Sequence, residues 1–288
     1  MENQGSNLNS YKNDKFDIIV LAGQSNAYGF GIGPVESEFV ENGSIFFLSD
    51  NLDIHFEKDE NGQDYLAIPE WQSNSIIPAK ERESENGKIG NLSLSFADKY
   101  INDGMLDEGR KILIVNAAVG GTGFMKKHWG VDAVLYRRLV ELTRISLGLN
   151  PENRVVAVLW HQGEHDAFES PEMDKDTRCD FYYHSLLSMF YNYINTFDLQ
   201  GIPIIAGSFC DEWYSKNKDN CDAVLKALEN VLFTFGSTVV CSNGLLSNNE
   251  KIGNGDDIHF CREALYILGE RYFAEYKRTL DEKLTVKM

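Results

Sequence analysis

Short apolar runs recur along the chain, separated by stretches whose apolar residues follow helical spacing. The apolar runs cover residues 17–22, 112–119, 155–160, 202–207 and 238–241. The helical stretches cover residues 92–101, 132–147, 181–194, 222–235 and 262–280. Short runs rich in Ile and Val are typical of parallel strands buried on both faces, and their alternation with helices indicates βαβ units. The pattern predicts an α/β protein with a flavodoxin-like parallel sheet of about five strands.

Residues 34–90 interrupt this alternation with a long polar stretch after the first strand. Within it, the alternating segments Ile45–Leu48 and Tyr65–Ile68 predict a small β-hairpin. Long loops in compact domains are usually functional or disordered, so this insertion is either a rim or lid over a site or a loop without a functional role. We expect residues 1–15 to be disordered or loosely attached, and residues 16–288 to form one domain that carries the insertion.

The charge balance is strongly acidic and narrows the classes of partner. The 44 Asp and Glu residues against 27 Lys and Arg residues give a formal net charge of −17. Nucleic-acid binding needs clustered basic residues, so the composition argues against a nucleic-acid partner and against docking on anionic membranes. It favours a substrate that is neutral, or at least not strongly anionic.

The cysteines and the apolar runs indicate the cellular compartment of the protein. The five cysteines are scattered and form no CxxC pair, which favours reduced thiols in an intracellular setting. The polar first residues show no signal peptide, and no apolar run approaches the roughly 20 residues that a membrane helix needs. We therefore expect a cytoplasmic protein without a membrane partner.

Four blocks of polar residues and glycines lie beside the predicted elements. Three come at the ends of predicted strands, and the fourth lies directly before the last predicted helix. The blocks are residues 23–27, 116–123, 160–166 and 256–259. Ligands of parallel sheets bind outside the carboxyl ends of the strands. We therefore expect the four blocks to meet at one edge of the sheet.

The first and last blocks contain the parts that a serine needs for acyl transfer. Ser25 supplies a hydroxyl, which is inert at neutral pH unless a base lies against it. His259 is the candidate base, because an imidazole is partly neutral near pH 7. Asp256 can reach the far nitrogen of that imidazole; Asp257 and Glu164 are the alternative carboxylates. The predicted catalytic set is Ser25, His259 and Asp256.

The same edge offers donors for an oxyanion. The candidates are the backbone N–H of Ser25, the backbone N–H of Gly120 or Gly121, and the side-chain amide of Gln162. Consecutive glycines let backbone N–H groups approach a ligand closely. Nucleophile, base, orienting carboxylate and oxyanion donors together are sufficient for ester hydrolysis.

Together the blocks resemble the SGNH hydrolase superfamily, most closely its branch of carbohydrate esterase family six and sialate O-acetylesterase-like proteins. The resemblance covers residues 17–260 and rests on Gly23-Gln24-Ser25-Asn26, Gly120-Gly121-Thr122 with Trp129 downstream, Trp160-His161-Gln162-Gly163-Glu164-His165-Asp166 and Asp256-Asp257-Ile258-His259-Phe260. Gln162 replaces the Asn of the superfamily's name, as is usual in this branch. Gln24, Asn26, Glu164 and Trp129 are candidates for supporting or substrate contacts.

The resemblance implies a three-layer α/β/α sandwich that removes O-acetyl groups from sugars without a metal. It implies Ser25 as nucleophile, Asp256 and His259 as acid and base, and the block-two glycine with Gln162 at the oxyanion. We therefore predict a serine acetylesterase that acts on an O-acetylated saccharide through an acetyl-enzyme, with no cofactor.

Two other functions are considered. His161, Glu164 and His165 fit an HxxEH zinc-peptidase pattern, but Gly163 interrupts the helix that zinc ligation would need. A non-catalytic carbohydrate-binding protein on the same fold is the second alternative, against which the complete Ser, His and Asp set argues.

Overall fold

The apolar runs of the sequence form strands of one central sheet. In the computed structural model, which describes residues 7–50, 54–68, 74–85 and 87–286, this sheet has seven strands in the order β11-β10-β9-β1-β8-β2-β5. They are β1 (Lys15–Gly23), β2 (Ile45–Ser49), β5 (Ser75–Pro78), β8 (Arg110–Asn116), β9 (Arg154–His161), β10 (Ile204–Gly207) and β11 (Val239–Val240). All neighbours pair in parallel except β2 and β5. Every expected strand is present, but the sheet has seven strands rather than about five, because β2 and β5 of segment 34–90 extend it beside β8.

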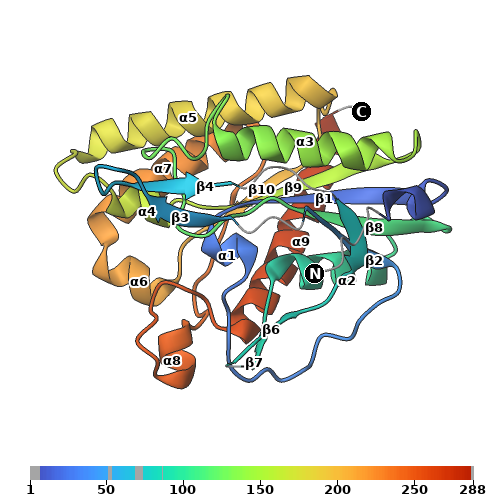
Figure 1. Ribbon diagram of the computed structural model, residues 1–288, viewed down its shortest axis with the longest axis horizontal. Helices are drawn as coiled ribbons and strands as arrows, with labels where there is room; N and C mark the ends of the chain where they lie inside the picture. The colour runs from blue at the N-terminus through green and yellow to red at the C-terminus, as the bar shows by residue number, and fades with distance from the viewer. Residues whose placement is uncertain (1–6, 51–53, 69–73, 86, 287–288) are drawn as a thin grey trace.

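Long helices cover both faces of the sheet. They are α2 (Leu92–Asn102), α3 (Val134–Gly148), α5 (Lys175–Phe197), α7 (Lys218–Thr234) and α9 (Arg262–Val286). Helices α3, α5 and α7 lie on one face, and α2 and α9 lie on the other (Figure 1). Ile18 and Val20 of β1 join the first core, whereas Ile19 and Leu21 join the second, because successive strand residues point to opposite faces. The three-layer α/β/α sandwich is confirmed.

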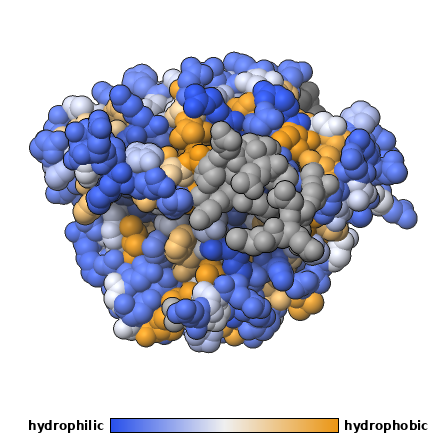
Figure 2. All heavy atoms as spheres, in the orientation of Figure 1, coloured by the Kyte–Doolittle hydropathy of each residue, from blue (hydrophilic) through white to orange (hydrophobic). Residues whose placement is uncertain are grey.

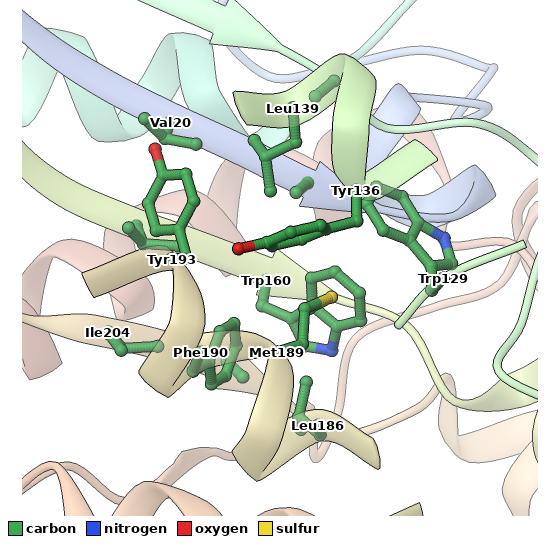
Figure 3. Close-up of a cluster of buried hydrophobic side chains, with 14 of the residues drawn as sticks. Val20, Trp129, Tyr136, Leu139, Trp160, Leu186, Met189, Phe190, Tyr193 and Ile204 are labelled. Carbon is green, nitrogen blue, oxygen red and sulfur yellow. The ribbon is translucent and has the colours of Figure 1, made fainter. Parts of the chain in front are cut away.

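Aromatic side chains fill the core beneath α3 and α5. Trp160 of β9 is fully buried and packs edge-on against Trp129 and Phe190, at centroid separations of 5.1 and 5.8 Å (Figure 3). Truncating a buried aromatic of this size to Ala costs about 3–5 kcal/mol, so this cluster is a main source of stability.

The outer surface is predominantly hydrophilic on the face seen in Figure 2. Among the helices of the described residues, none has both the length and the apolar content needed to cross a membrane.

The segment 34–90 is built into the sheet more closely than its polar sequence indicates. β2 pairs in parallel with β8, and β5 pairs with β2 at the sheet edge. The expected hairpin between Ile45–Leu48 and Tyr65–Ile68 is therefore wrong. Tyr65 instead lies in a separate hairpin of β3 (His55–Lys58) and β4 (Asp64–Ala67), and a second hairpin joins β6 (Arg82–Ser84) to β7 (Gly87–Ile89). Ile45 and Leu48 are buried, and burial against β8 decided their pairing.

Residues 7–14 are attached to the domain, contrary to the expected loose segment 1–15; residues 1–6 lie outside the described part. Asn7 accepts a hydrogen bond from the Ile76 N–H and donates one to its carbonyl, both at 2.8 Å. Tyr11, in the short 3-10 helix η1 (Leu8–Tyr11), packs edge-on against Phe46 at 5.6 Å. Two side chains therefore hold this segment against β2 and β5.

Candidate active site

Ser25 stands where β1 ends and the short helix α1 (Ser25–Tyr28) begins. The chain turns here at Gly23, whose φ is +125°. A Cβ at Gly23 would lie 2.1 Å from the carbonyl oxygen of His161, so only glycine lets β1 and β9 come this close. The Gln24 N–H donates to that same carbonyl at 2.9 Å. The strand ends therefore fix the position of the Ser25 hydroxyl.

The imidazole of His259 is held by Asp256 in the loop between α8 (Asn248–Ile252) and α9. Its Nδ1 lies 2.9 Å from both carboxylate oxygens of Asp256. Burial raises the pKa of Asp256, but hydrogen bonds from His259 and Asn248 outweigh this and bring the pKa below its ordinary value. Asp256 is therefore an ionised acceptor for the His259 Nδ1–H, which leaves the lone pair on Nε2.

The other carboxylates weighed for this role are engaged elsewhere. Asp257 accepts from the Lys216 ammonium at 2.7 Å, and Glu164 accepts from the Asn26 amide at 2.8 Å. Of the three, the structure brings only Asp256 against the imidazole.

Ser25, His259, Gly120 and Gly121 line one cavity of about 1200 Å³. A Cβ on Gly120 would lie 3.6 Å from the Ser25 Cβ, so the glycine loop approaches the serine closely. The segment 34–90 contributes part of the wall, which agrees with the rim interpretation of this insertion; its lining residues include Phe47, Ser49, Phe56, Ile77 and Arg82. The predicted nucleophile, base and backbone donors thus share one cavity.

Asn26 joins the loops of Ser25 and His259. Its amide donates to Glu164 Oε1 at 2.8 Å and to the Ile258 carbonyl at 3.2 Å, and its oxygen accepts from the Phe260 N–H at 3.1 Å. Ile258 and Phe260 flank His259 in the chain. The residue after the serine therefore holds the backbone on both sides of the histidine.

Beneath Asn26 lies a fully buried pair, Glu164 and His161. Tyr272 donates its hydroxyl proton to the Trp160 carbonyl at 2.9 Å, and its oxygen lies 2.8 Å from His161 Nδ1. His161 Nε2 lies 3.5 Å from Glu164 Oε1. Burial raises the pKa of Glu164, but the neighbouring His161 imidazole and the hydrogen bond from Asn26 bring it below its ordinary value. The carboxylate is thus ionised and holds the Asn26 amide.

Gln162 does not stand at the oxyanion, contrary to the expectation. Its amide nitrogen donates to Asp166 Oδ2 at 2.7 Å and lies 3.2 Å from Gln24 Oε1 and from the Thr122 carbonyl. The side chain is 1% exposed, and the lining of the cavity does not include it. Asp166 is almost fully buried, so it binds Gln162 rather than leaving that amide for a ligand.

Gln24 and Trp129 also have structural partners. Gln24 lines the cavity, but its amide oxygen lies 3.2 Å from both the His165 N–H and the Gln162 amide. Trp129 is 2% exposed, donates to Thr122 Oγ1 at 2.9 Å and belongs to the hydrophobic core, so its expected place at a sugar contact is wrong.

The three residues of the zinc motif do not together form a metal site. His161 is bound to Tyr272, and His165 Nε2 lies 3.8 Å from Glu169 Oε1. Throughout the described ranges, no three His, Cys, Asp or Glu side chains are arranged to hold a metal ion. The donor geometry therefore gives the zinc-peptidase alternative no support.

Phe30 and Arg82 also line the cavity, and neither was predicted from the sequence as a site residue. The Phe30 ring stacks on His259 with centroids 5.1 Å apart and an interplanar angle of 19°. Its neighbours Gly29 and Gly31 allow close backbone packing: a Cβ on Gly29 would lie 2.5 Å from the Gly90 carbonyl oxygen. The two glycines flanking Phe30 were the available signal in the sequence.

Comparisons with known proteins agree with this fold and these motifs. A curated protein of Escherichia coli K12, named a probable 9-O-acetyl-N-acetylneuraminic acid deacetylase, is 28% identical over 193 residues, which are 54% of this chain and 55% of the relative. The match thus spans about half the length of that relative. The solved structure of NanS has a TM-score of 0.66 at 19% identity, covering 93% of this chain and 98% of NanS. A protein of Arabidopsis thaliana has a TM-score of 0.63 at 21% identity, with coverage of 93% and 98%.

The two solved structures show a shared fold, and the family comes from a third comparison. The family model described as carbohydrate esterase, sialic acid-specific acetylesterase (SASA) matches residues 15–278, nearly the whole chain. The chain therefore belongs to the SASA family of carbohydrate esterases, as its motifs predict.

Proposed function

We propose that this protein is a serine acetylesterase that removes O-acetyl groups from a carbohydrate. One observation carries the proposal: Ser25, the Asp256-held His259 and the Gly120–Gly121 loop line a single cavity. Family membership supports the reaction class. These groups are the nucleophile, the oriented base and the backbone donors that ester hydrolysis needs.

In the first half-reaction, Ser25 Oγ attacks the acetyl carbonyl carbon while His259 Nε2 takes the hydroxyl proton. The negative charge that develops on the carbonyl oxygen faces the N–H groups of Ser25 and of Gly120 or Gly121. Losing one such donor typically costs about 10²–10³ in turnover. When the tetrahedral intermediate collapses, the bond to the sugar oxygen breaks and His259 returns the proton to that oxygen.

In the second half-reaction, water attacks the acetyl-enzyme. His259 accepts a proton from the water, acetate leaves, and the proton returns to Ser25. Asp256 stabilises the imidazolium in both halves, since its carboxylate is ionised and bound to Nδ1.

The substrate is proposed to be an O-acetylated sialic acid. The family description names a sialic acid-specific acetylesterase, and the Escherichia coli relative is named for 9-O-acetyl-N-acetylneuraminic acid. Acetate release from this compound and from acetylated xylo-oligosaccharides, compared as kcat/KM, tests the assignment. A higher kcat/KM for the xylo-oligosaccharides would contradict it.

The test of the mechanism uses p-nitrophenyl acetate, whose hydrolysis is followed by colour. Ser25→Ala should lower kcat/KM by at least about 10³-fold, because the covalent route is lost. Ser188→Ala, at an exposed position on α5, is the matched control and should leave the rate unchanged. Full turnover by a folded Ser25→Ala protein would refute the mechanism, and inactivity of the unmodified protein on every acetyl ester would favour a carbohydrate-binding role.

A cytoplasmic location is also proposed. The five cysteines are all free thiols, and four of them are buried. Proteins of reducing compartments keep their thiols in this state.

A further inference from the structure

The cavity wall carries a cation close to the candidate catalytic residues. Arg82, at the start of β6, places its guanidinium carbon 4.0 Å from the centroid of the Tyr28 ring and 5.8 Å from that of Phe30. One nitrogen, NH2, donates to the Gly29 carbonyl. An arginine has five N–H donors in a planar fork, so most of its donors remain for a ligand.

Among the residues that the structure describes, no carboxylate forms an ion pair with Arg82. The other arginine in the wall, Arg138, binds Asp50 at 2.5 Å. The carboxylate beside Arg82 in sequence, Glu81, is bound by Arg262 at 2.6 Å. Partial burial against the neighbouring rings lowers the pKa of Arg82 below its ordinary value, but the residue as a whole is exposed and the group stays charged. An accessible, charged guanidinium in the cavity wall with no paired carboxylate favours an anionic ligand.

A single ring connects this cation to the reacting groups. Phe30 lies 5.8 Å from the guanidinium carbon and 5.1 Å from the His259 imidazole, both measured to its centroid. The distance between the guanidinium carbon and the centroid of the imidazole ring therefore cannot exceed the sum of these two distances. An acetyl ester at Ser25 and an anionic group at Arg82 then belong to the same sugar or to adjacent sugars.

We propose that Arg82 binds a carboxylate of the substrate, so that the cavity selects O-acetylated sugar acids over neutral acetylated sugars. The inference rests on the proposed esterase function and identifies the residue that sets its specificity. A planar guanidinium held over Tyr28 matches a carboxylate with two parallel N–H donors. Because the net charge of −17 disfavours the approach of anions to the protein as a whole, a cation in the cavity wall favours binding of an anionic group at this place.

The experiment compares two substrates that differ in one group: 9-O-acetyl-N-acetylneuraminic acid and the same compound with its carboxylate replaced by a carboxamide. The readout is the ratio of the two kcat/KM values. In Arg82→Ala this ratio should fall by about 10- to 100-fold, as expected for losing a charge-assisted hydrogen bond. Arg82→Lys should keep part of the preference, because it retains the charge and loses the fork. Arg137→Ala removes the same charge from an exposed position of α3 outside the cavity lining and should leave the ratio unchanged.

Three outcomes would overturn the inference. The first is that the unmodified protein shows no preference for the carboxylate. The second is that Arg82→Ala lowers both kcat/KM values by the same factor, which would mean that Arg82 only holds the Gly29 turn. The third is that Arg137→Ala changes the ratio as much as Arg82→Ala does. The proposed function fails separately, by the absence of Ser25-dependent hydrolysis of p-nitrophenyl acetate.

Discussion

Replacing Asn26 by Ala should both destabilise the protein and impair its chemistry, because this one amide connects the loops of Ser25 and His259. The substitution removes the hydrogen bond to the ionised Glu164 carboxylate and those to the Ile258 carbonyl and the Phe260 N–H. Asn26 is fully buried, so solvent does not replace these partners.

The magnitude follows from the three contacts. A hydrogen bond to a charged group contributes about 1.5–3 kcal/mol, and each neutral one contributes about 0.5–1.5 kcal/mol. We expect the free energy of unfolding to fall by about 3–5 kcal/mol, a large share of the roughly 5–15 kcal/mol that a folded domain has. Since the backbone on both sides of His259 loses its anchor, the base moves relative to Ser25. A misplacement of about 1 Å lowers turnover by roughly 10²-fold.

Urea denaturation measures the stability, and hydrolysis of p-nitrophenyl acetate by the folded fraction measures kcat. Asn102→Ala is the control, because it removes a single exposed hydrogen bond to Asp98 and should change the stability by less than about 0.5 kcal/mol. An unchanged kcat in a destabilised Asn26→Ala protein would show that Asn26 serves packing alone. An unchanged stability would refute the reasoning from the three contacts.

Three further substitutions test other parts of the structure. Gly23→Ala should lower the yield of folded protein and the melting temperature sharply, since the new Cβ would lie 2.1 Å from the His161 carbonyl oxygen; a melting temperature equal to that of the parent contradicts this. The pKa of Asp256 is lowered in the folded state, so its contribution to stability is complete above about pH 4 and disappears as the pH falls through the lower, folded value. Urea midpoints at pH 3 and pH 6 should therefore differ less in Asp256→Asn than in the parent, and an equal difference refutes the assignment. Trp129→Phe removes the hydrogen bond to Thr122 and should lower the stability by about 1–2 kcal/mol without raising KM, whereas a raised KM would restore Trp129 to the substrate site.

The sequence by itself determined five of the seven strands of the sheet, the long helices and the edge of the sheet at which the candidate catalytic residues lie. The apolar run of residues 18–22 favours a strand covered on both faces, because this position removes all of its side chains from water. Parallel strands bring their carboxyl ends to one edge, so Ser25 and His259 were predicted to line the same cavity although they lie far apart in the chain. Asp256 and His259 are three residues apart, so their contact could be predicted from the local sequence.

Only the tertiary structure decided which partner each polar side chain has. Gln162 matches the family motif, but the buried Asp166 takes its amide, and no spacing along the chain predicts that competition. Trp129 was expected at a sugar contact, but it is enclosed in the hydrophobic core, and the β6–β7 hairpin of segment 34–90 places Arg82 in the cavity wall. Hydrophobic periodicity indicates which residues become buried, and it depends only on residues close together in the sequence. Hydrogen bonds and cation contacts depend on ångström distances between residues remote in sequence, and folding alone sets these distances.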